Sequence, residues 1–157
     1  MMIFFAVALT CVSAQAQQKI SIEIVDYGTY TVERVRTNTA GPLRPHDVDN
    51  IQHVATTTTV PAELGAEFGM RYRVSGRKEA IVDVTELDLF PPPGLKSPNS
   101  TKPLLKYSDR RTRKIGEVNY IGYSFDHAWE LVPGTWTFQL WIGSRMMAEQ
   151  NFTVVAK

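Results

Sequence analysis

The sequence predicts an all-β protein, an immunoglobulin-like antiparallel β-sandwich of about seven to eight strands that follows an N-terminal signal peptide. Pro133-Gly134 suits a tight turn, and residues 135–142 directly after it alternate apolar with polar side chains. The same two-residue period recurs in several short segments of the chain. No window of helical length keeps an apolar period of 3.6 residues without Pro or Gly. A small β-barrel is the second choice.

Residues 1–16 are expected to be a cleaved signal peptide, which places the protein in the periplasm or outside the cell. Residues 3–12 form an uncharged apolar run that is too short to span a bilayer, and Ala14-Gln15-Ala16 is a small-x-small cleavage signal. The single cysteine, Cys11, lies in this leader, so the mature chain can form no disulfide. Residues 17–157 are long enough to form one domain stabilised by its own core.

The first half of this domain is expected to contain three strands. Ile20, Ile22 and Ile24 begin a long strand that continues to Val32 and bends at Gly28. Residues 37–50 are polar, contain Gly and Pro, and are predicted to form a loop. Residues 51–60 are rich in Thr and compatible with a strand. Residues 68–74 alternate apolar side chains with arginines and are predicted to form a half-buried strand.

The second half continues the pattern. Residues 81–90 are predicted to form a strand, and the prolines of residues 91–103 indicate a long exposed connection. Residues 104–115 are a weaker strand candidate. Residues 118–129 carry aromatic side chains at both odd and even positions, so both faces of a strand there would be aromatic. No later segment has the apolar length needed to cross a membrane.

The closing hairpin allows a prediction of register. A two-residue loop, Gly143-Ser144, would place polar residues of the last strand on its apolar face. A three-residue loop that includes Arg145 instead pairs Met146 with Ile142, Ala148 with Leu140 and Phe152 with Trp136, and leaves only Gln150 against Phe138. We therefore predict the three-residue loop, with a β-bulge as the alternative.

Several turn and aromatic motifs together resemble a known family. These motifs are Phe68-Gly69-Met70-Arg71-Tyr72, Phe90-Pro91-Pro92-Pro93-Gly94, Gly122-Tyr123-Ser124-Phe125-Asp126, residues 130–138 and Phe152-Thr153-Val154. In this order they resemble an uncharacterised bacterial family of secreted immunoglobulin-like domains, a family of unknown function. The resemblance implies a sandwich over nearly the whole mature chain, and it brings no catalytic residue or ligand.

A basic segment is the first candidate site. Residues 96–114 hold seven Lys or Arg and one acid, Asp109. Arginine offers paired donors to oxyanions, so Arg110, Arg111, Arg113 and Lys114 could bind an anionic polymer or metabolite. The alternative is that these side chains form exposed pairs with the acidic segment that includes Asp83, Glu86 and Asp88.

Histidines and carboxylates in residues 46–53 are a second candidate. His46, Asp47, Asp49 and His53 are residue types that zinc accepts. Their spacing matches no zinc signature, and such residues are also ordinary turn residues. We therefore assign no metal and no cofactor.

Aromatic side chains are the third candidate. Most of those in the last third of the chain are expected to be core residues, but Trp141 shares its parity with polar neighbours. An exposed Trp141 would mark a contact surface for a protein or carbohydrate partner.

No catalytic motif is visible. The chain lacks Gly-x-Ser-x-Gly, His-Glu-x-x-His and a phosphate-binding glycine loop. Its net charge of +1 argues against bulk attraction to nucleic acid. The sequence therefore favours a non-enzymatic module that binds another envelope protein. The alternative is a binding protein for an anionic ligand that uses residues 96–114, and a metal-dependent enzyme is the third possibility.

Overall fold

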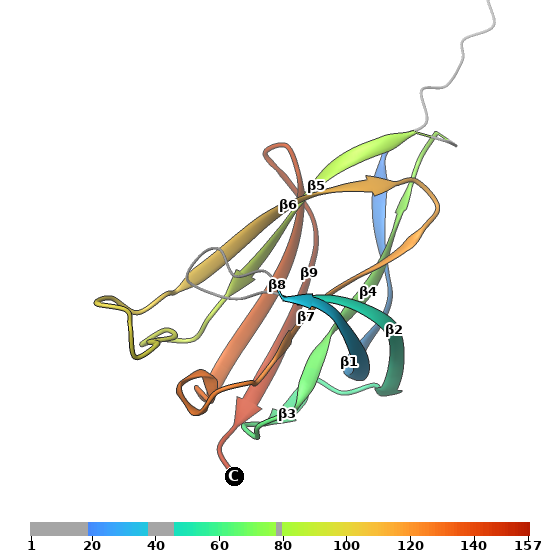
Figure 1. Cartoon of the computed structure of the whole chain (residues 1–157). Helices are drawn as coiled ribbons and strands as arrows, with labels where there is room; N and C mark the ends of the chain where they lie inside the picture. Colours follow the sequence, from blue (N-terminus) through green and yellow to red (C-terminus); the bar gives the residue numbers. More distant parts are fainter. Residues whose placement is uncertain (1–18, 38–45, 78–79) are drawn as a thin grey trace, which may run out of the picture.

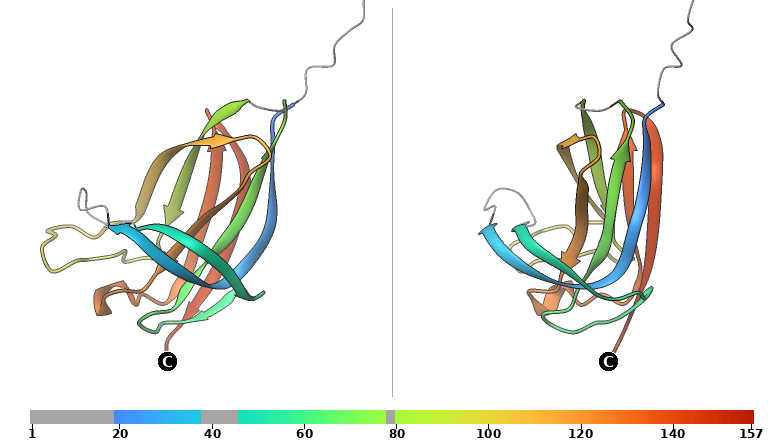
Figure 2. Two further views of the ribbon diagram at one scale, coloured as in Figure 1. Left: turned by 45° about the vertical axis from the view of Figure 1, so that its right-hand side comes forward. Right: turned by 90° about the vertical axis from the view of Figure 1, so that its right-hand side faces the viewer.

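The computed structural model describes residues 19–37, 46–77 and 80–157, which form two β-sheets packed face to face. Figures 1 and 2 show the two layers, with the C-terminus at one end of the strands. The predicted signal peptide, residues 1–16, lies outside the described residues. No helix within the described part of the chain has the length and apolar character that crossing a membrane requires.

The first sheet has four strands in the order β2-β1-β4-β7. Their bounds are β1 Ser21–Thr37, β2 His46–Ala55, β4 Glu67–Ser75 and β7 Val118–Ser124. β1 pairs with β4 over its first half and with β2 over its second half. The outer half of β1 and its partner β2, here called the β1–β2 ribbon, therefore curve away from the rest of the sheet (Figure 2).

The second sheet has five strands in the order β3-β9-β8-β5-β6. Their bounds are β3 Thr59–Pro61, β5 Ile81–Leu89, β6 Lys106–Lys114, β8 Gly134–Ile142 and β9 Arg145–Val155. All pairs are antiparallel except β3 with β9. A single 3-10 turn, η1 Ala128–Glu130, follows β7.

Aromatic side chains from both sheets form the core. Phe68 of β4 is fully buried and lies against the rings of Trp136, Phe138 and Phe152 from the opposite sheet. Each such residue removes a large apolar area from water, and edge-to-face ring pairs add to this stabilisation. Trp136 also donates a hydrogen bond from Nε1 to the Val132 carbonyl at 2.9 Å. The core therefore lies toward the β3, β9 and β8 side of the sandwich.

The long first strand bends where the sequence predicts. Gly28 has a φ of 140°, and a Cβ at this position would lie 1.9 Å from the Ala55 carbonyl oxygen. Only glycine allows β1 and β2 to approach this closely.

Two local predictions in the N-terminal half are wrong. Residues 46–50 belong to β2 rather than to a loop, because β1 continues to Thr37 and supplies a pairing partner for them. Residues 51–60 contain the end of β2 and then β3, with a break at residues 56–58. This division gives nine strands in the described residues, against the seven to eight that the sequence predicts.

The closing hairpin has the predicted pairs in its body and a different loop. Trp136 pairs with Phe152, Phe138 with Gln150 and Leu140 with Ala148, as expected. The predicted pair of Met146 with Ile142 is wrong, because Ile142 lies opposite Arg145 and Trp141 opposite Met146. The loop has two residues, and Gly143, with a φ of 58°, suits the first position of a type II′ turn. A bulge after Leu140 restores the register, as the alternative prediction expects.

Candidate functional site

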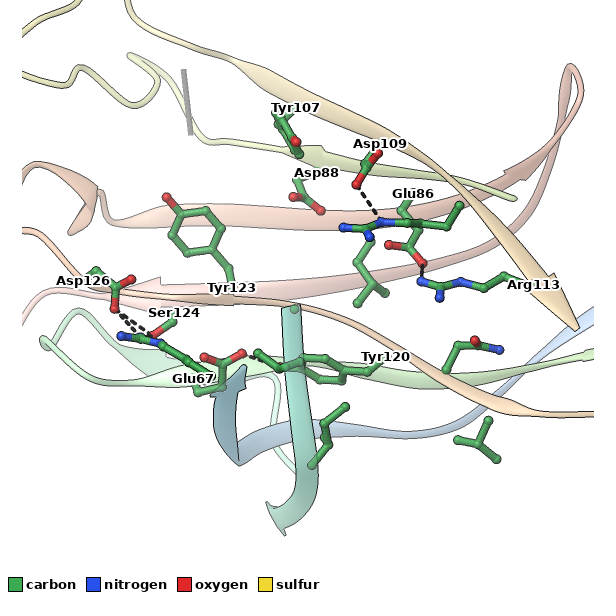
Figure 3. A pocket seen from close by; sticks show the side chains of 18 of the residues that line it. Glu67, Glu86, Asp88, Tyr107, Asp109, Arg113, Tyr120, Tyr123, Ser124 and Asp126 are labelled. Carbon is green, nitrogen blue, oxygen red and sulfur yellow. Dashed lines mark hydrogen bonds and ion pairs between the residues drawn. The ribbon is translucent and has the colours of Figure 1, made fainter. Parts of the chain in front are cut away.

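A polar cavity of about 370 Å³ lies between the two sheets, at the side where β6 and β7 are the edge strands. One wall consists of side chains from β5 and β6, and the other of side chains from β4 and β7 (Figure 3). The β1–β2 ribbon contributes Arg34, Val48 and Ile51. We call this space the inter-sheet cavity. Its titratable lining residues are Arg34, Glu67, Glu86, Asp88, Tyr107, Asp109, Arg111, Arg113, Tyr120, Tyr123, Asp126 and Glu130.

Strand alternation explains why the lining is charged. Val84, Glu86 and Asp88 share one parity of β5, so the side of the strand that buries Val84 also places two carboxyl groups between the sheets. The inward parity of β6 likewise places four polar side chains between the sheets, those of Tyr107, Asp109, Arg111 and Arg113. Inward residues of a sandwich usually form its apolar core. Here the apolar core ends and a charged row replaces it.

A three-residue bridge lies at one end of the cavity. Tyr72 of β4 donates a hydrogen bond from its hydroxyl group to Glu86 Oε1 at 2.6 Å, and Arg113 Nε donates to the same hydroxyl group at 3.0 Å. Arg113 also pairs with Glu86 at 2.5 Å. Burial and the nearby Glu86 carboxylate raise the pKa of Tyr72, so its hydroxyl group stays protonated and donates. This bridge joins the two sheets.

Polar groups also pair at the other end. Arg34 of the β1–β2 ribbon donates to Ser124 Oγ at 2.7 Å and forms an ion pair with Asp126. Tyr120 donates to Glu67 Oε1 at 2.7 Å, and burial raises the pKa of Glu67. Glu130, buried in η1, accepts hydrogen bonds from the backbone N–H groups of residues 126 and 127 and from the Tyr123 hydroxyl group. The arginine thus fastens the ribbon to the β7 wall.

Asp88 differs from the other carboxyl groups of the cavity. Its Oδ1 atom is buried and has no hydrogen-bond partner among the described residues. It lies in the cross-strand row between Phe138 of β8 and Tyr107 of β6, with Tyr123 across the cavity (Figure 3). Burial and the neighbouring Glu86 and Asp109 carboxylates raise the pKa of Asp88 well above its usual range. The cavity lining therefore includes a carboxyl group that has no hydrogen-bond partner among the described residues and a raised pKa.

The comparison with sequence families assigns the chain. Residues 18–154 match the family DUF3859, which is described as a domain of unknown function. The chain belongs to the DUF3859 family. No protein among the curated ones matches it.

A solved structure supports the immunoglobulin-like fold of this DUF3859 chain. It is similar to an immunoglobulin-like protein from Pseudomonas aeruginosa, with 29% sequence identity and a TM-score of 0.67. The similarity covers 89% of this chain and 99% of the other. The predicted fold class and the predicted family resemblance are thereby confirmed.

The DUF3859 structure divides the predicted basic site between two faces. Arg111 and Arg113 point into the inter-sheet cavity, where they pair with Asp109 at 2.7 Å and Glu86 at 2.5 Å. Arg110 and Lys114 lie on the outer face and pair with Asp83 at 2.6 Å and Glu117 at 3.8 Å. The four side chains therefore do not converge on one anion.

Trp141 lies on the outer face of the five-stranded sheet. It is half-buried, and its Nε1 donates to Gln139 Oε1 at 2.9 Å. Thr85 of β5 pairs with Trp141 on one side and with Arg110 on the other, so these two candidate residues lie in one cross-strand row. Trp141 is separated from the inter-sheet cavity by the sheet itself.

The predicted histidine and carboxylate cluster forms no metal site in the described residues. The side chains of His46 and Asp47 lie outside the described part of the structure. Asp49 accepts from the Asn50 backbone, and His53 Nε2 lies 3.1 Å from the Tyr27 carbonyl oxygen. The described residues contain no group of three or more His, Cys, Asp or Glu arranged to hold a metal ion.

In the sequence, the acidic segment of β5 stands out only as a possible partner for the basic segment. Nothing in the sequence links Asp88, Tyr107 and Tyr123 to one cavity. The available signal was the parity of β5, because Glu86 and Asp88 continue the row of Val82 and Val84.

Proposed function

We propose that this DUF3859 domain is a non-catalytic binding module that takes a small polar group into the inter-sheet cavity. The observation that carries the proposal is the unpartnered Asp88 carboxyl group, which lines a cavity of about 370 Å³. A buried polar group without a partner costs free energy, and a bound ligand would remove that cost. The volume is within the range of sites that hold small molecules.

The module is further proposed to act in the cell envelope, where another protein can supply the bound group as one of its side chains. This part rests on the leader-like residues 1–16 and on the secreted character of the family that the motifs resemble. The edge strands β6 and β7 flank the cavity, so a partner segment could lie along either edge while one side chain enters.

An anionic ligand held by the basic segment is the second candidate of the sequence, and the geometry favours it less. The exposed pair of Arg110 with Asp83 and the pair of Lys114 with Glu117 already neutralise the outward cations. The lining of the inter-sheet cavity has six carboxyl groups and three guanidinium groups, which disfavours an anion inside it.

Ligand-observed NMR with a library of small amines, carboxylic acids, sugars and amino acids tests the proposal. Ile51→Trp on β2 enlarges a side chain that lines the cavity, whereas Val54→Trp places the same indole side chain at an exposed position of the same strand. Binding should weaken at least about tenfold in Ile51→Trp and stay unchanged in Val54→Trp. The proposal would be overturned if no library member binds the wild-type protein more tightly than it binds an Ile51→Trp variant with a normal unfolding curve.

A further inference from the structure

The charge balance of the inter-sheet cavity indicates which class of ligand it takes. Each of the three arginines in the lining has a carboxylate partner, namely Asp126 for Arg34, Asp109 for Arg111 and Glu86 for Arg113. Three carboxyl groups remain, those of Glu67, Asp88 and Glu130. Of these, Glu67 and Glu130 accept hydrogen bonds from tyrosine hydroxyl groups and, for Glu130, from backbone N–H groups. Asp88 is the carboxyl group still available to a ligand.

The groups around Asp88 favour a cation. Glu86 lies on the same strand, and Asp109 and Tyr107 face Asp88 from β6. Tyr123 faces it from β7, whereas Tyr120 points from the other face of β7 and bonds to Glu67. The β8 neighbour of Asp88, Phe138, carries no charge. Arg111 lies further along β6 and is held by Asp109. The field at Asp88 is therefore negative, and the aromatic rings near it also attract cations.

We infer that the inter-sheet cavity binds an ammonium or guanidinium group, with the Asp88 carboxylate as its direct partner. The inference rests on the proposed function and specifies its ligand. The group belongs either to a free small amine or to a lysine or arginine side chain of a partner protein. As the cation enters, Asp88 loses its proton to solvent and the two charges form a buried, hydrogen-bonded pair.

This exchange makes binding depend on pH. At pH values below the raised pKa, Asp88 carries a proton, and a cation binds only with release of that proton. Affinity should therefore rise as pH rises through the elevated pKa of Asp88. A neutral ligand that accepts a hydrogen bond from protonated Asp88 would show the opposite trend.

The test compares two probes of nearly the same shape, n-butylguanidinium and n-butylurea, by titration calorimetry on the full chain. The guanidinium probe should bind at least about tenfold more tightly, with proton uptake by the buffer. Asp88→Asn should abolish this preference. Glu149→Gln is the matched control, because it makes the same carboxyl-to-amide change at an exposed position on the outer face of the five-stranded sheet. Unfolding curves of both variants are measured alongside, to establish that each variant folds.

The outcomes separate the inference from the proposed function. If butylurea binds as tightly as butylguanidinium and Ile51→Trp weakens both, the cavity is a binding site and the inference is wrong. If neither probe binds, but other library members bind the wild-type protein and lose affinity in Ile51→Trp, the inference is again wrong and the proposed function stands. If nothing binds in the cavity, both fail.

A third probe distinguishes the sources of the cation. A blocked tripeptide with a central arginine contains the same guanidinium group together with a peptide backbone. Binding at least about tenfold tighter than that of butylguanidinium would assign the site to a partner protein. Equal or weaker binding would assign it to a free amine.

Discussion

Replacing Glu86 by Gln should destabilise the domain by about 3 kcal/mol, the lower end of the cost of breaking a buried ion pair. The side chains of Glu86 and Arg113 are only 11% and 22% exposed, and they form their pair between the sheets with the Tyr72 hydroxyl group. Glutamine keeps the shape but leaves the guanidinium charge without its counter-charge in a place where water reaches it poorly. The lower end of the range applies because Arg113 retains some contact with solvent.

The same two strands supply the control. Asp83→Asn breaks the ion pair with Arg110, also between β5 and β6, but on the outer face where the side chains are 46% and 72% exposed. Exposed pairs contribute little because water and salt screen them. Urea unfolding, followed by the fluorescence of the buried Trp136, should show a lower midpoint for Glu86→Gln and an unchanged midpoint for Asp83→Asn.

A triple variant completes the test. Glu86→Leu, Arg113→Met and Tyr72→Phe together remove both charges and the hydroxyl group that would otherwise lose its partners, so this variant should recover most of the stability that Glu86→Gln loses. If Glu86→Gln and Asp83→Asn have the same effect, the inter-sheet bridge is solvated and the reasoning is refuted.

Three further variants test other parts of the structure. Because the pKa of Asp88 is raised in the native state, the native chain binds this proton more tightly than the unfolded chain does. The wild-type free energy of unfolding should therefore fall as pH rises from about 4 through the elevated pKa, and Asp88→Asn should lack that fall. Urea midpoints measured across pH check this. Parallel pH profiles would contradict the assignment. Gly69→Ala places a Cβ 2.2 Å from the Ile121 carbonyl oxygen, so it should lower the free energy of unfolding by about 3 kcal/mol in the same assay. A loss below about 1 kcal/mol would show that β4 and β7 can separate freely. Arg34→Ala removes the contact that fastens the β1–β2 ribbon to the β7 wall, so amide exchange should accelerate in β2 and stay unchanged in β4; equal rates in β2 with and without Arg34 would contradict this role.

The sandwich could be predicted because its signal is local. Residues 68–74 and 135–142 each show the two-residue period, and each forms a strand. The hairpin loop was harder to predict. An extra loop residue and a bulge each shift the alternation of β9 by one residue, so the sequence pattern does not distinguish them. A two-residue loop with a bulge and a three-residue loop give the same pairs from Ala148 onward. β2 was missed at residues 46–50 because its pairing partner is the unusually long β1, a non-local property.

The cavity could not be predicted as a site, although part of its signal was present. β5 carries Val82, Val84, Glu86 and Asp88 on one parity and Leu87 and Leu89 on the other. By hydrophobicity alone, the second half of the strand would turn its leucines inward. The structure keeps one parity throughout, so the carboxyl groups point inward and the leucines outward. Which strands face this row depends on the topology, and Tyr123 is brought opposite only by the pairing of β7 with β4.

The energetic cost of this arrangement is the strongest reason to regard the cavity as functional. Buried ion pairs such as that of Glu86 with Arg113 add little stability relative to apolar residues of similar size. An unpartnered carboxyl group such as that of Asp88 lowers stability, and a polar cavity between the sheets lacks the apolar contacts that a close-packed interior gains. Leucine or valine at these inward positions would extend the aromatic core toward β6 and β7. A domain that serves only as a scaffold would gain from that change, whereas a domain that binds a charged group between its sheets would lose its site.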